Sequence, residues 1–363
     1  VGAVKARFVY RLAGETMKPV PAPATIRDVA RQAGVGLGTV SRVLNGGANV
    51  SLETRNRVLA AIKRLDFRPH AQARRILQPH SGMVCFLMSN RAFMHSFHAR
   101  VLQGVENCAT ALKQHVIYTV AHYDPLTPPS RIPIPPILQE RGWVDGLILT
   151  GLVHGNFLRR IQDLHIPFVA LGNNVVTGDG PGDFDRVGFD EYKGVYDAVC
   201  YLAGQGHRRI MFVGDVSFPW FQERFKGYLA AARSKKLGHI SMTNKMNTGG
   251  FQEYGERAVS RLLAMEPRPT AVMAGNDEIA YGVWRALVRN GLSAPKDVSL
   301  VGFDDREEAN LMDPPLTTVR VHKEEIGEAL MKLLLEKLHQ PGQPFTKRIF
   351  STELVTRESV RAI

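Results

Sequence analysis

Residues 25–45 decide how the N-terminal part of this chain folds, and they read TIRDVARQAGVGLGTVSRVLN. Apolar residues recur in this stretch at the spacing of two short helices, which begin at Ile26 and Leu37. Thr25, followed three residues later by Asp28, predicts a capping box at the start of the first helix. The glycine after that helix predicts a tight link to the second. Two short helices joined in this way predict a helix-turn-helix.

A third helix is expected to complete this region. Ser51 is its predicted N-cap, and Val58, Leu59, Ile62 and Leu65 form its predicted apolar stripe. The alternative is a bare three-helix bundle with no binding role. Such a bundle would not need a second helix whose outward face is polar.

That outward face suits nucleic acid. In the second helix Val40 and Val43 share the apolar side, which leaves Thr39, Ser41 and Arg42 on or near the other side. Hydroxyl groups suit phosphate oxygens, and a guanidinium group suits the O6 and N7 atoms of guanine in the major groove. We therefore predict that this helix reads DNA.

The positive charge of the chain gathers at the same end. The net charge is +12 over 363 residues, and residues 1–80 hold 14 Lys and Arg against 4 Asp and Glu. The remaining 283 residues hold 32 Lys and Arg against 30 Asp and Glu. A basic end beside a nearly neutral partner is typical of a nucleic-acid-binding module. The alternative is a basic tail that only adds solubility.

Beyond residue 80 the pattern changes to short apolar runs that alternate with amphipathic segments. The runs predict strands at residues 83–88, 116–121, 146–150, 168–171, 210–213, 271–274 and 299–303. The amphipathic segments predict helices at residues 101–113, 192–203, 225–234, 254–264, 278–289 and 324–338. This alternation predicts parallel sheets covered on both faces, in two doubly wound halves with a cleft between them. Residues 122–136, which include six prolines, are predicted to form a surface loop.

Several short strings follow one another in a characteristic order. TVSRVLN stands at residues 39–45, GHRRI at 206–210, ND at 276–277, GFDD at 302–305 and PLTTV at 315–319. In this order they resemble the LacI-type transcriptional repressor family over roughly residues 25–360. The resemblance implies a repressor that binds double-stranded operator DNA as a homodimer and responds to a small-molecule effector, expected to be a carbohydrate or a related metabolite.

We therefore expect a small all-α helix-turn-helix domain and a periplasmic-binding-protein-like α/β core of two doubly wound parallel-sheet subdomains. The expected parts are a disordered extension at 1–24, the DNA-binding domain at 25–68, a hinge helix or linker at 69–80, and the effector-binding and dimerisation core at 81–363. Within the core, the two subdomains are expected to comprise 81–187 with 323–350, and 188–322 with 351–363. Residues 351–363 contain no leucine heptads, so we expect a dimer without a tetramerisation coil.

For the DNA contact the resemblance implies residues on the helices and the hinge, namely Thr25, Leu37, Gly38, Thr39, Ser41, Arg42, Asn45, Arg74 and Ile76. Ile76 stands where the family inserts an apolar side chain, usually Leu, into the minor groove, and such a wedge bends the duplex. A plain basic linker is the alternative. Leu37 and Gly38 stand where the family has base-reading side chains. Because glycine has no side chain and leucine can touch only a thymine methyl, direct readout is expected to depend on Arg42.

The predicted cleft has its own candidate residues. Asn276 and Asp304 follow strand ends, where ligands of open α/β sheets bind, and Arg224 is suited to hold a ligand hydroxyl or carboxylate. The full set of effector-binding candidates is Phe93, His95, Phe97, Asn173, Arg224, Phe251, Asn276 and Asp304. For each of them the alternative is a packing or capping role.

Other functions find little support in the sequence. Three cysteines, at positions 85, 108 and 200, fit neither a disulfide framework nor a metal site, and they favour a reducing, cytoplasmic compartment. His95 and His98 lack an evident third metal ligand, and no catalytic motif occurs, so we expect no enzyme activity, metal or cofactor. No apolar run is long enough to cross a membrane. The N-terminus has no secretory signal, which disfavours the runner-up, a soluble periplasmic-type sugar-binding protein without a DNA-binding role.

Overall fold

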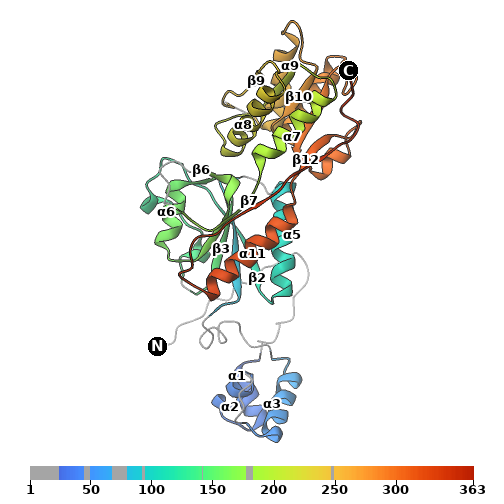
Figure 1. Cartoon of the computed structure of the whole chain (residues 1–363). Helices are drawn as coiled ribbons and strands as arrows, with labels where there is room; N and C mark the ends of the chain where they lie inside the picture. Colours follow the sequence, from blue (N-terminus) through green and yellow to red (C-terminus); the bar gives the residue numbers. More distant parts are fainter. Residues whose placement is uncertain are drawn as a thin grey trace, which may run out of the picture. The chain divides into compact units, whose positions relative to one another are not determined.

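The computed structural model of this chain describes residues 24–44, 50–67, 80–91, 95–140, 142–176, 183–246 and 249–363. The chain divides into two compact units, Val1–Pro79 and His80–Ile363 (Figure 1). Of the expected extension only Ala24 is among the described residues, and of the expected hinge only His80. The expectations for these two segments therefore stay predictions.

The first unit contains three described helices, α1 Ile26–Ala33, α2 Leu37–Leu44 and α3 Leu52–Arg64. The predicted capping box is confirmed at the start of α1: the Thr25 hydroxyl accepts from the N–H of Asp28, and the Asp28 carboxylate accepts from the N–H of Thr25 at 2.9 Å. Gly34 ends α1 in the left-handed conformation, with φ +65°. Ser51 caps α3 through the N–H of Thr54, as predicted.

A small apolar core holds these three helices together. Val29, Val40 and Val58, one from each helix, are fully buried in it. The prediction for Leu59 is wrong, because this side chain is 50% exposed. Successive side chains of a helix are about 100° apart around its axis, so Leu59 points away from the core that Val58 faces. Ala61 follows Val58 by three positions, faces the core again and is buried.

In the second unit, the first sheet has the strand order β13-β7-β5-β3-β1-β2, with every pair parallel. Its strands are β1 Met83–Ser89, β2 His115–Ala121, β3 Gly146–Gly151, β5 Phe168–Leu171, β7 Arg186–Phe189 and β13 Lys347–Phe350. Its helices are α5 Ser96–Ala111, α6 Gly155–Asp163 and α11 Lys323–His339. We call this sheet with its helices the first lobe.

Both faces of this sheet are covered, which explains why β1 is apolar throughout. Val84, Phe86 and Met88 belong to one cluster with residues of α5 and α11, whereas Cys85 and Leu87 belong to another with residues of α6. Successive side chains of a strand point to opposite faces, so each face needs its own apolar set.

The second sheet has the order β14-β12-β11-β10-β8-β9, and only the pair β12–β14 is antiparallel. Its strands are β8 Ile210–Val213, β9 Ile240–Met242, β10 Ala271–Ala274, β11 Ser299–Asp304, β12 Thr317–Arg320 and β14 Glu353–Val355. Its helices are α7 Glu191–Gly204, α8 Pro219–Ser234, α9 Phe251–Leu263 and α10 Asp277–Arg289. We call this sheet with its helices the second lobe. A separate two-stranded sheet pairs β4 Val153–His154 with β6 Val175–Val176.

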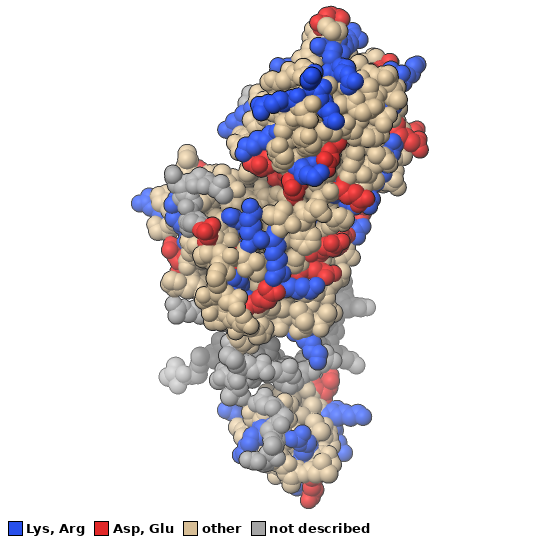
Figure 2. Space-filling model, viewed as in Figure 1, with Lys and Arg blue, Asp and Glu red and all other residues tan. Residues whose placement is uncertain are grey.

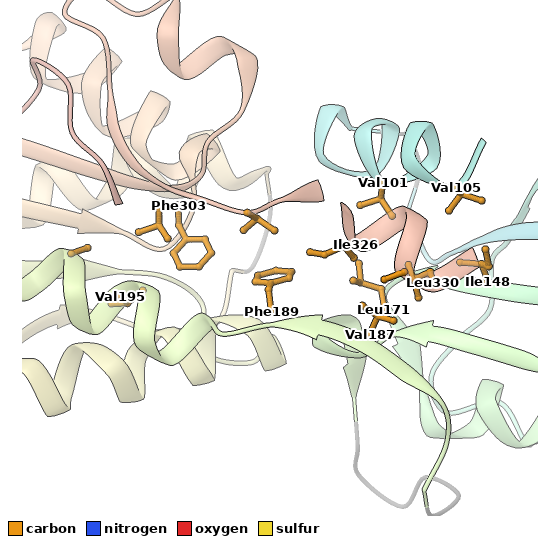
Figure 3. Packing of buried hydrophobic residues seen from close by; sticks show 14 of the residues in the cluster. Val101, Val105, Ile148, Leu171, Val187, Phe189, Val195, Phe303, Ile326 and Leu330 are labelled. Carbon is orange, nitrogen blue, oxygen red and sulfur yellow. The ribbon is translucent and has the colours of Figure 1, made fainter. Parts of the chain in front are cut away.

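The chain passes from the first lobe to the second after β7. Strand β7 pairs with β13 as far as Phe189, which lies opposite Phe350. The passage between the lobes therefore comes two residues after Val187, where the border was expected. The crossing itself is apolar: the rings of Phe189 and Phe303 lie 6.4 Å apart between their centroids. The two rings join the cores of the lobes into one continuous cluster (Figure 3).

Within the first lobe, α5 and α11 lie side by side and approach closely through two glycines (Figure 1). A Cβ atom added to Gly104 would lie 2.0 Å from the carbonyl oxygen of Glu324, and one added to Gly327 would lie 2.0 Å from that of Val101. Backbone atoms fill the place of both side chains, so only glycine permits this helix spacing.

We predict that Gly104→Ala lowers the free energy of unfolding by roughly 1–3 kcal/mol, because overpacking costs more than the helix propensity that alanine adds. Gly204→Ala is the matched control, since Gly204 is also helical and has no heavy atom within 4 Å of its added Cβ. Urea unfolding should show a loss for the first variant and no loss for the second. Equal stability of Gly104→Ala and the parent chain would contradict the close packing.

Candidate functional site

In the first unit, the described candidates for DNA contact lie mainly on α2. Leu37, Gly38 and Arg42 are exposed, and Thr39 and Ser41 are half-buried. Figure 2 shows Lys and Arg side chains on the visible face of this unit. On α2 the accessible polar groups are therefore the guanidinium of Arg42 and the hydroxyls of Thr39 and Ser41, which are groups that suit contact with DNA.

The remaining DNA candidates stand differently. Thr25 is exposed, but its hydroxyl donates to Asp28 at 2.6 Å and serves first as a helix cap. Asn45, Arg74 and Ile76 lie outside the described residues, so their roles stay predictions.

In the second unit, a cleft opens between the lobes. It has about 490 Å³ of empty space, part of it open to solvent. In each sheet the first strand of the lobe, β1 or β8, has a later strand on both sides. The strand order reverses there, and ligands of open α/β sheets bind beyond the strand ends at the point of reversal. The lining residues are Arg91, His95, Phe97, His98, Asn174 and Phe189 from the first lobe, and Trp220, Arg224, Phe251, Asn276, Glu278, Asp304 and Arg306 from the second.

Six of the eight predicted effector residues line this cleft, namely His95, Phe97, Arg224, Phe251, Asn276 and Asp304. Phe93 lies outside the described residues. Asn173 is not among the residues that line the cleft, and its predicted contact with an effector stays a prediction. Its amide donates to the carbonyl of Phe189 and accepts from the N–H of the same residue, both at 2.9 Å, so it positions β7.

Seven lining residues were not among the predicted effector residues, namely Arg91, His98, Asn174, Phe189, Trp220, Glu278 and Arg306. Two of these residues could have been predicted from their position at a strand end. Arg91 comes two residues after the end of β1, and Phe189 is the last residue of β7. Strand ends mark such sites. Trp220 lies in the first turn of α8 and has no comparable local signal.

Arg224 organises the floor of the cleft. Its Nη1 donates to the carbonyl of Gly275 at 2.6 Å, and its Nη2 donates to Glu191 at 3.0 Å and to Asp304 at 3.3 Å. Its guanidinium carbon lies 3.8 Å from the ring centroid of Phe303. Both terminal nitrogens thus have partners within the protein, and only Nε is buried without one. The expected role of Arg224 as a simple ligand clamp is therefore too narrow.

Burial controls the protonation of the acids around this floor. Loss of solvent raises the pKa of Glu191 to about 7, although the charge of Arg224 acts in the opposite direction. Burial likewise raises the pKa of Asp304, and it raises that of Asp277 to about 8. In the first lobe, burial lowers the pKa of His98 to about 3, so this imidazole is neutral near pH 7.

Polar side chains also connect the two lobes at the cleft. The Nε of Arg306 donates to the hydroxyl of Ser96 at 2.8 Å, and Nδ1 of His95 lies 3.4 Å from the carboxylate of Glu278. Neither pair belongs to an apolar core, so these links can break without unfolding either lobe.

Within the described ranges, no group of three or more His, Cys, Asp and Glu is placed to hold a metal ion. No helix in the same ranges is long and apolar enough to cross a membrane.

Comparison with known families gives two matches along the chain. Residues 25–70 match the family described as bacterial regulatory proteins, lacI family. Residues 199–360 match the periplasmic binding protein-like domain. The first match covers the described helices of the first unit, and the second covers most of the second lobe together with α11.

Whole-chain relatives extend this similarity. The HTH-type transcriptional repressor PurR of Klebsiella pneumoniae (strain 342) is 33% identical over 343 residues, which is 93% of this chain and 97% of that protein. The repressor CytR of Escherichia coli (strain K12) is 29% identical over 342 residues, which is 94% of this chain and 97% of that protein.

Solved structures show the same architecture. The Lac repressor dimer bound to operator and the anti-inducer ONPF has a TM-score of 0.78 at 23% identity, covering 94% of this chain and 100% of that one, and supports the fold alone. The transcriptional regulator CelR in complex with cellobiose has a TM-score of 0.66 at 27% identity. The match covers 93% of this chain and 99% of that one.

The raised pKa of Glu191 predicts a pH-dependent stability. Because the folded chain holds this proton more tightly than the unfolded chain, the stabilising contribution is complete below the ordinary pKa of 4.5 and is lost as the pH rises through about 7. Glu191→Gln keeps an oxygen that can accept from Arg224 and cannot ionise. The difference in unfolding free energy between this variant and the parent should therefore shift in favour of the variant as the pH rises.

Chemical unfolding checks this prediction. It is measured at a series of pH values from the ordinary pKa of 4.5 to above the folded-state pKa of about 7. The matched control is Glu253→Gln, since Glu253 is an exposed partner of Arg257 on the surface of α9. A difference for Glu191→Gln that stays constant across the series would show that Glu191 is already ionised in the folded chain.

Proposed function

Because the chain belongs to the LacI family of bacterial regulatory proteins, we propose that it represses transcription by binding a specific operator, with an affinity that a small molecule in the interlobe cleft controls. The observation that carries the proposal is the pairing of two features in one chain. One is a capped helix-turn-helix with an exposed Arg42. The other is a lined cleft between two lobes that remain separable at its mouth.

DNA binding is assigned to the first unit. Leu37 and Gly38 offer little hydrogen-bonding capacity at the start of α2, so Arg42 carries most of the direct base readout, and Thr39 and Ser41 contact phosphate. In the hinge, the family resemblance implies that Arg74 contacts DNA and that Ile76 forms a minor-groove wedge.

Effector binding is assigned to the cleft of the second unit. Aromatic rings from both lobes, such as Phe97 and Phe251, alternate with polar groups such as Asn276, which suits a ligand with a ring and several hydroxyls. CelR, which is 27% identical, is solved with cellobiose, and this supports a carbohydrate-sized effector here. The effector changes operator affinity only as far as it distinguishes two arrangements of the lobes.

The alternative function is a sugar-binding protein of the periplasmic type without a DNA-binding role. It would account for the cleft, but not for a helix-turn-helix whose polar helix faces outward. No enzyme activity is included in the proposal, and the proposed compartment is the cytoplasm, where operator DNA is found.

Arg42→Ala tests the DNA-binding role. We expect a loss of roughly 1–3 kcal/mol in operator binding and relaxed discrimination at one base pair, because one bidentate base contact disappears. The operator is first selected from a random DNA library, and binding is then measured by fluorescence anisotropy at fixed salt. The control is Arg57→Ala, which removes an equal charge from an exposed position on α3.

The pattern of loss decides the outcome. Arg57→Ala should affect all DNA sequences alike. If Arg42→Ala also weakens every sequence to the same extent, Arg42 contacts phosphate and the base-reading assignment is wrong. Failure of the parent chain to select any sequence would favour the sugar-binding alternative.

A homodimer completes the proposal. The edge strand β2 has no described strand beyond it, and its Tyr118 is 42% exposed. Leu112, at the end of the neighbouring helix α5, is 47% exposed. Native chains cover such edges, and an isologous dimer covers two at once.

Tyr118→Lys should shift the chain from dimer to monomer, since a two-fold interface brings two introduced charges together. Tyr192→Lys is the matched control, because Tyr192 is 41% exposed but lies on α7 in the second lobe. Sedimentation velocity over a concentration series measures the result. A fully dimeric Tyr118→Lys, or a monomeric Tyr192→Lys, would exclude this edge as the interface.

A further inference from the structure

The arginines that line the cleft differ in their ion pairing. Three guanidinium groups and two carboxylates line it. Arg224 pairs with Asp304, and Arg306 pairs with Glu278. Arg91 makes no ion pair within 4 Å to a described residue, although the carboxylates of Glu278 and Asp304 are near enough to raise its pKa against the effect of burial.

Two aromatic rings of the second lobe position the guanidinium group of Arg91. Its guanidinium carbon lies 5.2 Å from the ring centroid of Trp220 and 5.9 Å from that of Phe251. These rings belong to the second lobe, whereas Arg91 follows β1 in the first. The aromatic rings hold the guanidinium group without supplying a hydrogen-bond acceptor.

The cleft also has an excess of hydrogen-bond donors. Among the described residues, the side-chain atoms that are buried without a partner include Nε of Arg91, Nε of Arg224 and Nδ1 of His98, and all three residues line the cleft. His98 is neutral and its Nε2 lies 3.2 Å from the amide nitrogen of Asn174, so its proton is on Nδ1. All three atoms are therefore donors, and a buried donor without an acceptor is costly.

A ligand that satisfies these donors must bring several acceptor oxygens, and one that pairs directly with Arg91 must also bring negative charge. We propose that the effector of this chain is an anion of sugar size, a polyhydroxylated molecule with one carboxylate or phosphate group that pairs with Arg91. The planar guanidinium group can donate two parallel hydrogen bonds to either kind of group. This inference rests on the proposed control by a cleft ligand and specifies its chemical class.

The remaining groups of the cleft fit the uncharged part of such a molecule. Oδ1 of Asn276 accepts from the N–H of Ile279 and caps α10, which leaves its amide nitrogen to donate to a hydroxyl. Phe97 offers a half-buried ring surface from the first lobe. Neutral sugars could use these groups but would leave Arg91 without its counter-charge.

The test separates a small-molecule extract of the native host on an anion-exchange column into a retained and an unretained fraction. Each fraction is added to the full chain with its selected operator, and anisotropy reports operator affinity at constant ionic strength. We expect the retained fraction to change operator affinity by roughly 5- to 150-fold, which is the usual range of allosteric coupling. The unretained fraction should have no effect.

Phosphatase treatment of the retained fraction distinguishes the two acidic groups. Loss of the effect identifies a phosphate ester, and survival identifies a carboxylate. An effect found only in the unretained fraction overturns this inference but leaves the proposed function standing. An effect in neither fraction overturns the effector control on which both rest.

Arg91→Gln tests the residue itself. It should raise the concentration of the active fraction needed for half of the effect by roughly 10- to 150-fold, because a charge-assisted contact is lost. Arg257→Gln, which changes an arginine that stacks on Tyr254 outside the cleft, should leave that concentration unchanged. An unchanged response of Arg91→Gln would overturn the assignment.

Thermal unfolding without any fraction provides a second readout for the same variant. Removal of a buried cation that has no ion pair within 4 Å should leave the unfolding midpoint unchanged or raise it. A midpoint lowered by several degrees would show that Arg91 has a structural partner in the free protein, and would overturn its role as the unpaired charge.

Discussion

The second lobe depends on the burial of one guanidinium group. Arg224 comes from α8, and its acceptors come from the start of α7, the end of β10 and the end of β11. These acceptors converge only when β10 and β11 lie side by side and α7 packs against α8. Because a buried ion that loses its partner costs about 3–5 kcal/mol, this network makes the strand order and the helix packing depend on each other.

The same network determines what the cleft can offer to a ligand. It uses up the carboxylates of Glu191 and Asp304, so acceptors are scarce and N–H donors and aromatic rings remain. Below this floor, Phe189 and Phe303 join the two lobes through apolar contact, whereas at the cleft Arg306 and Ser96 join them through a polar one. A continuous core at the crossing and separable polar links at the mouth are the arrangement that hinge motion between lobes requires.

The first unit is stabilised in a more local way. Its helices begin and end at caps formed by residues at most four positions apart, and its core is small. Under the proposed function this local stability has a use, because α2 must keep its side chains in place on DNA while the effector acts on the larger unit.

The sequence by itself determined the elements that depend on near neighbours. The Thr25–Asp28 capping box, the Ser51 cap and the apolar runs of β5, β8 and β10 follow from residue type and spacing within a few positions. The position of Asn276 and Asp304 at strand ends was predictable for the same reason. Short strands such as β7, β12 and β13 were not, because their side chains alternate with polar or small residues and their pairing partners lie far away in the chain.

Only the tertiary structure decided which side chains work together. Arg224 pairs with residues 33 and 80 positions away, and Asn173 turns to the backbone of β7 instead of the cleft. Among the described residues, Arg91 lacks an ion pair within 4 Å because Asp304 and Glu278 lie closer to other arginines. Such partnerships depend on strand order and on competition among all neighbouring charges, and no local pattern of residues contains that information.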